Sequence, residues 1–195
     1  MQHSEAKQQL RRRMLELRNG KPKRDLDELS IKIVHQLLDL NEMKQANTFC
    51  TYLSTGSEVR TYEIVQWALS SGKRVIVPIV DRTGRRLHFS EIKNPEVELE
   101  KGTFGILEPK REYRRLMPLE KADVILIPGI AWDLRGYRIG YGQGFYDRSI
   151  DALKRTIVKI GLAYEFQIVE KLPASRYDCR IDLLVTEHRI IKPEA

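Results

Sequence analysis

The sequence predicts one α/β domain over residues 1–195, with a mostly parallel central sheet flanked by helices in a Rossmann-like arrangement. Residues 48–80 read as strand, loop, helix and strand, and a βαβ unit of this kind pairs its strands in parallel. Residues 124–127 are four apolar residues without alternation, which is typical of a strand buried on both faces of a sheet. No internal repeat and no linker interrupts the chain, so we expect a single domain.

Apolar spacing and turn residues define the expected elements. In the first helix Leu10, Met14 and Leu17 recur at helical spacing, and Asn19-Gly20 is a stop signal. A β-branched run that begins at Arg74 reads as a strand, although Pro78 interrupts it. The expected helices cover residues 4–18, 25–40, 61–71 and 145–153, and the expected strands cover residues 48–53, 74–80, 87–92, 124–127, 156–162 and 181–186.

The composition is that of a water-soluble protein with an anionic partner. The formal net charge is +7, from 34 basic and 27 acidic side chains, which favours nucleotides, polycarboxylates or nucleic acid without choosing among them. No apolar run approaches the roughly 20 residues that span a bilayer, and the N-terminal residues are polar, so we expect a cytoplasmic protein with no membrane partner. Two distant cysteines and four scattered histidines do not predict a zinc site, so any metal should be oxygen-liganded, such as Mg²⁺.

Residues 138–148 form the most distinctive stretch. Three of the chain's 12 glycines fall within five residues there, between Arg138 and Arg148, and a predicted helix follows at Phe145. Glycines allow the backbone to approach a ligand closely, and arginines add bidentate donors for phosphate. The pattern is neither a Walker loop nor the dinucleotide fingerprint. It predicts a phosphate-binding loop with Asp147 beside a cation, although a tight strand-to-helix turn capped by Asp147 is the alternative.

Basic residues also mark one edge of the first helix. At 100° per residue, Lys7, Arg11 and Arg18 fall within about 40° of one another beside the apolar stripe. They are expected to form a basic ridge where this helix meets the body of the protein. A solvated charged flank is the alternative.

Three further carboxylates stand where they could reach a ligand. Glu58 follows the first strand, in a loop at the edge where ligands of parallel sheets collect, although it could simply be a helix-start acid. Glu108 precedes Pro109, which holds it out of a helical conformation, so its side chain is either presented to a site or an ordinary loop acid. Asp182 interrupts the last apolar strand and is either a ligand or a strand-end residue facing water.

These features together predict a site for a polyphosphate with Mg²⁺. The sequence contains no G-x-S-x-G motif and no cysteine with a nearby histidine, so no activated nucleophile is indicated. That favours chemistry in which ATP supplies the activation and the protein positions the reactants.

The sequence resembles the 5-formyltetrahydrofolate cyclo-ligase (5,10-methenyltetrahydrofolate synthetase) family across nearly its whole length. The glycine block ending in Tyr146-Asp147-Arg148 is the most specific part of the resemblance. The motifs that carry it, in chain order, are Lys7-x-x-Leu10-Arg11 with Arg18, Tyr52-Leu53-Ser54 with Glu58 and Thr61, Gly105-Ile106-x-Glu108-Pro109, Pro128-Gly129-x-Ala131-Trp132-Asp133, Gly136-x-Arg138-Ile139-Gly140-Tyr141-Gly142-x-Gly144-x-Tyr146-Asp147-Arg148, and Asp178-x-x-x-Asp182.

The resemblance implies conversion of 5-formyltetrahydrofolate to 5,10-methenyltetrahydrofolate, with ATP as co-substrate, Mg²⁺ as cofactor, and release of ADP and phosphate. It implies a fold similar to that of sugar-phosphate isomerases and CoA-transferases. The formyl oxygen would attack the γ-phosphate, and N10 of the folate would then close the ring. The implied partners are ATP, 5-formyltetrahydrofolate and its polyglutamates, with no nucleic acid, and we expect a monomer.

The resemblance also implies a role for particular residues. Trp132, Gln143 and Phe145 depart from the residues that relatives commonly carry. The implied ATP-binding residues are Lys7, Gln8, Gln9, Leu10, Arg11, Arg138, Ile139, Gly140, Tyr141, Gly142, Gln143, Gly144, Phe145 and Tyr146. The implied folate-binding residues are Leu53, Glu58, Glu108, Trp132, Tyr141, Gly142, Gln143, Gly144 and Phe145. The implied catalytic residues are Arg138, Tyr141 and Arg148, and the implied Mg²⁺ ligands are Asp147 and Asp182.

Two other classes of function are compatible with parts of the pattern. An isomerase or CoA-transferase of related fold would act without ATP and would need a carboxylate as base. A basic RNA-binding module would need clustered Lys and Arg with exposed aromatics, whereas here the glycine loop is the better-organised feature.

Overall fold

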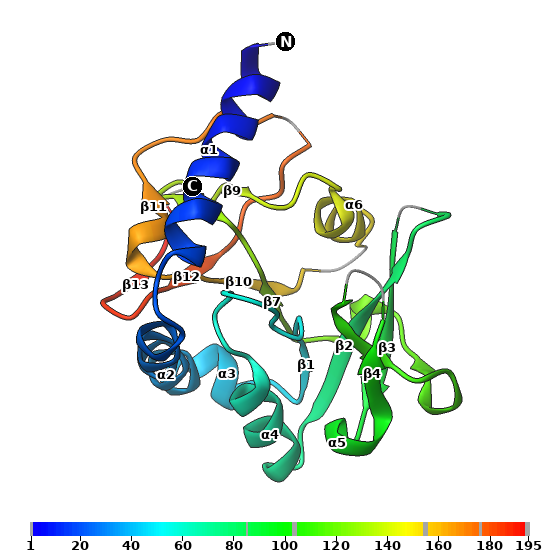
Figure 1. Ribbon diagram of the computed structural model, residues 1–195. Helices are drawn as coiled ribbons and strands as arrows, with labels where there is room; N and C mark the ends of the chain where they lie inside the picture. The colour runs from blue at the N-terminus through cyan, green and yellow to red at the C-terminus, as the bar shows by residue number, and fades with distance from the viewer. Residues whose placement is uncertain (1, 85, 103–104, 154–155, 176, 194–195) are drawn as a thin grey trace.

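The structure is a computed structural model that describes residues 2–84, 86–102, 105–153, 156–175 and 177–193. Within these residues, eight strands form the main sheet in the order β13-β12-β10-β7-β1-β2-β3-β6 (Figure 1). Its strands are β1 (Thr48–Cys50), β2 (Arg74–Asp81), β3 (Arg86–Ile92), β6 (Arg115–Leu116), β7 (Val124–Ile127), β10 (Val158–Leu162), β12 (Leu183–Val185) and β13 (Ile190–Ile191). Neighbours from β12 to β2 pair in parallel, whereas β13 and β3 join antiparallel. The predicted mostly parallel α/β fold is confirmed.

Helices cover both faces of this sheet. They are α1 (Gln2–Asn19), α2 (Lys23–Asp39), α3 (Asn41–Gln45), α4 (Tyr62–Ser70), α5 (Pro95–Glu98) and α6 (Phe145–Asp151), with short 3₁₀ turns η2 (Arg111–Tyr113), η3 (Leu119–Lys121) and η4 (Glu165–Gln167). In Figure 1, α2, α3 and α4 lie together on one side of the sheet. The core on their side includes Val124 and Leu126, and the core on the α6 side includes Ile125 and Ile127. The strand at 124–127 is therefore buried on both faces, as predicted.

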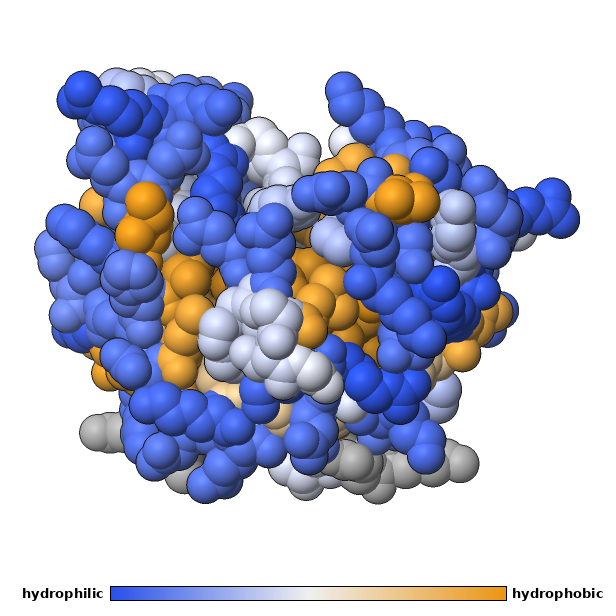
Figure 2. Space-filling view, turned by 90° about the horizontal axis from the view of Figure 1, so that it is seen from below, coloured by the Kyte–Doolittle hydropathy of each residue, from blue (hydrophilic) through white to orange (hydrophobic). Residues whose placement is uncertain are grey.

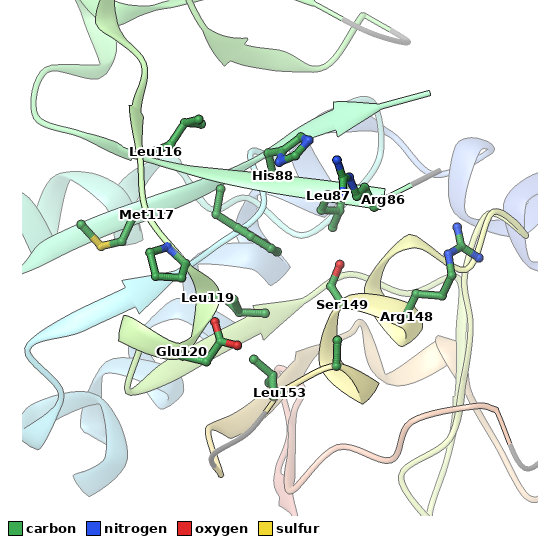
Figure 3. Close-up of a pocket in the computed structure, with 13 residues that line it drawn as sticks. Arg86, Leu87, His88, Leu116, Met117, Leu119, Glu120, Arg148, Ser149 and Leu153 are labelled. Carbon is green, nitrogen blue, oxygen red and sulfur yellow. The ribbon is translucent and has the colours of Figure 1, made fainter. Parts of the chain in front are cut away.

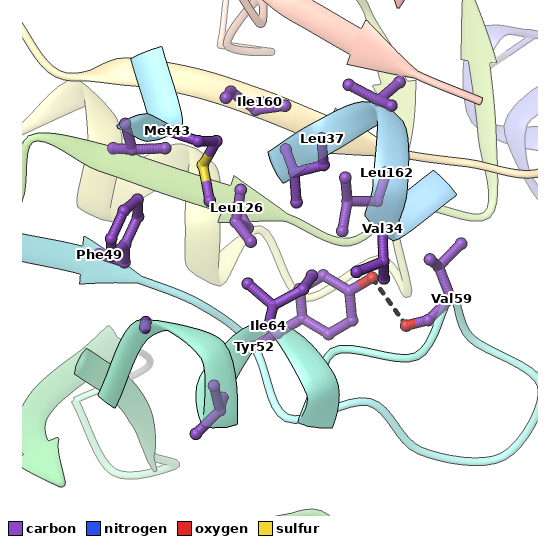
Figure 4. Packing of buried hydrophobic residues seen from close by; sticks show 14 of the residues in the cluster. Val34, Leu37, Met43, Phe49, Tyr52, Val59, Ile64, Leu126, Ile160 and Leu162 are labelled. Carbon is purple, nitrogen blue, oxygen red and sulfur yellow. Dashed lines mark hydrogen bonds between the residues drawn. The ribbon is translucent and has the colours of Figure 1, made fainter. Parts of the chain in front are cut away.

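The core on the α2–α4 side also anchors the loop that follows β1. Figure 4 shows Tyr52 among the apolar side chains, with its hydroxyl directed at Val59. The Tyr52 hydroxyl donates a hydrogen bond to the Val59 carbonyl at 3.1 Å, and both residues are buried. Because this contact fixes both ends of the loop, the polar residues between them are held at the carboxyl edge of the sheet.

The structure corrects several expected boundaries. The first strand ends at Cys50 rather than at residue 53. The strand expected at 181–186 spans only Leu183–Val185, and the helix expected at 145–153 ends at Asp151. Pro78 is accommodated in β2 because β1 pairs only with Arg74 to Ile76, so beyond them β2 pairs with β3 alone.

Two small sheets and the helix α3 were not predicted. One sheet has the order β11-β8-β9, from Ile168–Val169, Ala131–Asp133 and Arg138–Ile139, and the other pairs β4 (Leu99–Lys101) with β5 (Leu107–Pro109). Strands of two or three residues are too short to show a hydrophobic period, so a sequence pattern does not reveal them.

The strand order reverses at β1, which has β2 on one side and β7 on the other. In an open parallel sheet, ligands bind at such a switch point, beyond the carboxyl ends of the strands. In Figure 1, α1 runs beside β9, with α6 on the far side of β9. The two helices therefore border the region above this switch point.

The face of the molecule seen in Figure 2 is largely polar. Figure 2, which views the molecule from below the orientation of Figure 1, shows hydrophilic residues around most of this face and hydrophobic ones between them near its middle. In the part of the chain that the structure describes, no helix has both the length and the apolar character that crossing a membrane requires.

Candidate active site

A pocket of about 580 Å³ lies at the carboxyl ends of β1, β2 and β7. It combines an apolar wall with basic and acidic groups, which is the usual character of a small-molecule site. Its lining residues are Lys7, Arg11, Tyr52, Leu53, Thr55, Glu58, Pro78, Val80, Leu87, Ile106, Glu108, Pro128, Arg138, Ile139, Gly140, Tyr141, Gly142, Gln143, Gly144, Phe145, Tyr146, Asp147 and Asp178. The glycine loop, the two basic residues of α1 and the loop carrying Glu58 therefore meet in one cavity.

The glycine loop runs from the end of β9 to the start of α6. Gly142 has φ of 92° and Gly144 has φ of 64°, and side-chain-bearing residues rarely adopt either value. The carbonyl of Gly140 accepts a hydrogen bond from Arg11 Nε at 2.8 Å, and that of Gln143 accepts one from Arg148 Nη2 at 2.7 Å. Since α6 has only seven residues, the basic side chains, rather than a long helix dipole, give this loop its positive potential.

The predicted basic ridge of α1 faces this pocket. Lys7 Nζ lies 2.7 Å from Asp178 Oδ2, which joins α1 to the segment before β12. Arg11 is bound to the Gly140 carbonyl and forms no ion pair with a described carboxylate. Arg138 is buried, and its Nη2 lies 2.9 Å from Asp147 Oδ1. Lys7 and Arg11 of the predicted ridge thus line the pocket, whereas Arg18 is not among its lining residues. Arg11 contributes a positive charge without an ion-pair partner among the described carboxylates beside the glycine loop.

Glu58 is buried at the inner end of the pocket and holds two hydrogen bonds. Its Oε2 accepts from the Thr55 backbone N–H at 2.9 Å, and its Oε1 accepts from the Tyr141 hydroxyl at 3.1 Å. Burial raises the pKa of Glu58 above its usual value of 4.5, although the Thr55 N–H and the Arg18 guanidinium oppose that rise. A carboxylate placed this way can accept N–H groups from a bound ligand.

Glu108 lies on the strand β5 and also lines the pocket. It is only 5% exposed, and its Oε1 accepts a long hydrogen bond of 3.4 Å from the Val80 backbone N–H. A side chain at Gly102 would lie 2.8 Å from Glu108 Cδ, so the glycine leaves room for this carboxylate. The structure therefore brings Glu108 to the same cavity as Glu58, on a different wall.

Trp132 is in the core rather than in the pocket. It is fully buried in β8, and no described group hydrogen-bonds its Nε1. A Cβ atom at Gly129 or at Gly161 would lie 2.4 Å or 2.6 Å from the indole ring. These glycines make space for the indole, so a folate contact through Trp132 is not supported.

Within residues 7–11, only the two basic side chains line the pocket. Gln8 and Gln9 are exposed, and Leu10 packs against the small apolar cluster that includes Met14, Ile130 and Ile139. Three residues of the expected ATP-binding segment therefore point elsewhere, because a helix presents only every third or fourth residue to one side.

Arg148 and Asp182 also lie outside this pocket. Arg148 braces the glycine loop through the Gln143 carbonyl, and a Cβ at Gly144 would lie 2.8 Å from its Nη1. Asp182 accepts a hydrogen bond from the Lys159 backbone N–H at 2.7 Å and pairs with Lys159 Nζ at 3.0 Å. The predicted Asp147–Asp182 metal pair is therefore not formed: each carboxylate is held by a separate basic side chain.

Some residues that form the site were not assigned a role from the sequence. Asp178 is the second carboxylate beside the glycine loop, and Pro78, Val80, Leu87 and Ile106 form the apolar wall. Asp178 could have been found from its spacing before the last strand, because it stands in the same quoted motif as Asp182. The apolar residues carry no local signal, since they look like ordinary strand residues.

A second pocket of about 410 Å³ lies on the other side of α6 (Figure 3). Arg148, Ser149 and Leu153 line it from the α6 side, opposite Leu116 and Met117. Arg148 is the only predicted site residue that borders it, so it is not the cavity that the sequence pattern describes.

Comparison with known proteins agrees with the geometry. The model of the 5-formyltetrahydrofolate cyclo-ligase family matches residues 3–187. The chain is 28% identical to the 5-formyltetrahydrofolate cyclo-ligase of Haemophilus influenzae over 94% of this chain and 99% of that protein. It is 32% identical to that of Escherichia coli K12 over 74% and 80% of the two chains.

Solved structures give the same result. The 5,10-methenyltetrahydrofolate synthetase of Aquifex aeolicus matches with a TM-score of 0.84 and 32% identity, over 97% of this chain and 93% of that one. The synthetase of Mycoplasma pneumoniae, at 24% identity and a TM-score of 0.76, shares the fold over 93% and 98% of the two chains. The chain belongs to the 5-formyltetrahydrofolate cyclo-ligase family.

Proposed function

We propose that this protein converts 5-formyltetrahydrofolate to 5,10-methenyltetrahydrofolate with hydrolysis of ATP to ADP and phosphate. The observation that carries the proposal is the meeting of two different subsites in one pocket. A glycine loop with three basic residues suits a polyphosphate, and a buried Glu58 suits an N–H-bearing ring. Family membership supports this substrate pair.

The basic end of the pocket is assigned to ATP. Arg11 is available to a phosphate, since it donates to the Gly140 carbonyl and forms no ion pair with a described carboxylate. Lys7 is paired with Asp178, and Arg138 is paired with Asp147. These ion pairs keep both cations beside the glycine loop. The positive φ values of Gly142 and Gly144 let the backbone approach the phosphates without a side chain between them.

The acidic end is assigned to folate. The pterin ring carries adjacent N–H donors, which match a buried carboxylate that already has one oxygen fixed by the Thr55 N–H. Glu108, on β5, offers a second acceptor, and Leu53 with Ile106 supplies apolar contact for the ring.

The reaction is a phosphoryl transfer followed by ring closure. The formyl oxygen attacks the γ-phosphorus and the bond to ADP breaks, which gives an N5-iminium phosphate. N10 then forms a bond to the formyl carbon and loses its proton, and the C–O bond breaks to release phosphate. The role of the chain is to align the formyl oxygen with the γ-phosphate and to stabilise the charge on the transferring group through Arg11 and Arg138.

The residues present fit Mg²⁺ with one protein carboxylate. Among the described residues no group of three His, Cys, Asp or Glu side chains forms a metal cage. Mg²⁺ is commonly held by one or two carboxylates together with substrate phosphates and water, so a cage is not required. Asp147 borders the pocket and would hold the ion, which would neutralise charge on the phosphates when bound. Asp182 would contribute only if it left Lys159.

The test is the near-ultraviolet absorbance of methenyl-folate, measured with purified protein, 5-formyltetrahydrofolate, ATP and Mg²⁺. Absorbance should grow with all components present and should not grow when ATP is omitted, with one ADP formed per methenyl-folate. No growth of absorbance with every component present would refute the proposal. Turnover of a sugar phosphate or an acyl-CoA without ATP would instead support the isomerase or transferase alternative.

The partners are proposed to be small molecules. Folate polyglutamates, a monomeric state and a cytoplasmic location all stay predictions of the sequence. Titration of labelled RNA at two salt concentrations, with and without ATP, tests the remaining alternative. An RNA-binding module would bind with a steep salt dependence and no effect of nucleotide.

A further inference from the structure

Arg18 is a buried cation that has no role in the proposed reaction as described above. It lies in the last turn of α1 and is only 3% exposed. Its Nε donates to Ser57 Oγ at 2.9 Å, its Nη1 to the Gly129 carbonyl at 3.3 Å, and its Nη2 to the Tyr141 hydroxyl at 2.9 Å. Arg18 forms no direct ion pair with any described carboxylate. Burying an unpaired charge is unfavourable, so we expect a carboxylate that Arg18 reaches through a bridging group.

That acid is Glu58, and Tyr141 is the bridge. The Tyr141 hydroxyl lies 2.9 Å from Arg18 Nη2 and 3.1 Å from Glu58 Oε1. A guanidinium can only donate hydrogen bonds and an ionised carboxylate can only accept them. The tyrosine hydroxyl must therefore accept from Arg18 and donate to Glu58. Glu58 protonated on Oε1 would leave the hydroxyl facing two donors, and an ionised carboxylate accepts a stronger hydrogen bond than a neutral acid, so this chain of bonds favours ionised Glu58.

Among the other groups around Glu58, the Thr55 backbone N–H lowers the pKa of this carboxyl more than Arg18 does, whereas Arg60 lowers it less. Arg60, in the same loop, is engaged by Asp27, with Arg60 Nε 2.7 Å from Asp27 Oδ1. Tyr52 and Tyr146 face Glu58 from the loop after β1 and from α6, and burial raises the pKa of both phenols, so they stay neutral. Thr55 contributes one backbone N–H.

We propose that Arg18 is a positioning residue for folate: through the Tyr141 hydroxyl it holds the Glu58 carboxylate ionised and in place to accept N–H groups of the substrate. The proposal rests on the proposed function, which assigns Glu58 to the pterin ring. Arg18 also joins α1 to the glycine loop and to the loop after β1, so the two subsites share one support.

The first experiment compares Arg18→Met with Arg13→Met, which removes an exposed arginine from the same helix. Loss of a charged donor to a buried network should weaken folate binding about tenfold at neutral pH, with ATP affinity within about twofold of wild type. Folate affinity is lost as pH falls through the pKa of Glu58. Without Arg18 that pKa rises further, so the loss should begin at a higher pH. Arg18→Lys, which keeps a charge and a donor, should restore part of the affinity.

Tyr141→Phe provides the second experiment, because it removes only the bridging hydroxyl from a half-exposed residue. It should shift the pH profile of folate binding in the same direction as Arg18→Met. The double variant should be no weaker than the weaker single variant, because both changes break the same chain of bonds. This variant decides the question if Arg18→Met does not fold.

Binding is measured at equilibrium with 5-formyltetrahydrofolate alone, so the readout does not depend on turnover. If wild type binds folate but the two variants keep its affinity and pH profile, the positioning role is overturned. It is also overturned if Arg18→Met lowers Tm and weakens ATP and folate equally. If wild type neither binds folate nor forms methenyl-folate, the proposed function itself fails.

Discussion

At the scale of single residues, Glu58 shows how a binding site opposes stability. Its side chain is buried with a carboxylate whose pKa is raised chiefly by desolvation, and the hydrogen bonds from Thr55 and Tyr141 only partly offset that cost. An acceptor kept in this state is ready for a ligand, but the folded protein is less stable for it.

Glu58→Gln should therefore stabilise the free protein while it weakens folate binding. Because the folded-state pKa lies above the usual 4.5, the folded state binds more protons than the unfolded state above that pH, and stability falls as pH rises. Wild type should lose more Tm than Glu58→Gln between pH 5 and about pH 8. Folate should bind the variant about tenfold more weakly, since the acceptor charge is lost. Glu63→Gln, at an exposed position, is the control.

Asp147 and Asp182 are paired as metal ligands in the family pattern, but we expect their substitution to affect the Mg²⁺ requirement differently. Asp147 borders the pocket, so Asp147→Asn should raise the Mg²⁺ concentration needed for half-maximal activity by about tenfold or more and leave folate affinity unchanged. Asp182 is held by Lys159, so Asp182→Asn should leave the Mg²⁺ requirement near that of wild type. Activity titrated against Mg²⁺ distinguishes them. An equal increase in the Mg²⁺ requirement of both variants would show that the two carboxylates bind the ion together.

At the scale of elements, the shape of the glycine loop is set by its backbone conformation and by the hydrogen bonds to its carbonyl groups. Its two positive-φ residues turn the chain between β9 and α6, and Arg11 and Arg148 bind its carbonyl groups from opposite ends. These contacts hold the loop in one conformation, which lowers the entropy cost of binding phosphate.

Gly142→Ala should disturb this preformed loop. Its φ of 92° is strained for any residue with a Cβ, at a cost of about 1–3 kcal/mol. In a domain of this size, each kcal/mol lowers Tm by about 2–4 °C, and the KM for ATP should rise. Gly140→Ala is the matched control for Tm, because Gly140 has no positive φ and a Cβ there would meet no atom within 4 Å. Equal Tm values for the two variants would show that the loop relaxes without strain.

At the scale of the whole molecule, Trp132 locks the small β8 sheet onto the main sheet. The indole fills the space left by Gly129 and Gly161, and it has no hydrogen-bond partner for Nε1 among the described groups. The site therefore lies on a packed core that fixes the position of the segment before the glycine loop.

Trp132→Phe should cost little stability. The smaller ring loses apolar contact, but it also removes a buried unpaired N–H, whose burial costs about 1–3 kcal/mol. The net loss should be about 1 kcal/mol or less in chemical denaturation, and folate affinity should not change. Gly161→Ala should cost more, because its Cβ would lie 2.6 Å from the indole ring. Weaker folate binding by the Trp132→Phe variant would show that Trp132 does belong to the folate site.

The sequence by itself determined the parts of the fold and site that have a local signal. The βαβ order, the doubly buried strand at 124–127, the turn glycines and the basic edge of the first helix all follow from period, composition or spacing within a few residues. Only the tertiary structure decided that Trp132 is core, that Asp178 rather than Asp182 borders the pocket, and that Arg18 reaches Glu58 through Tyr141. Tyr141 is 123 residues from Arg18 and 83 from Glu58, and contacts at such separations are set by strand order and packing, on which no local pattern reports.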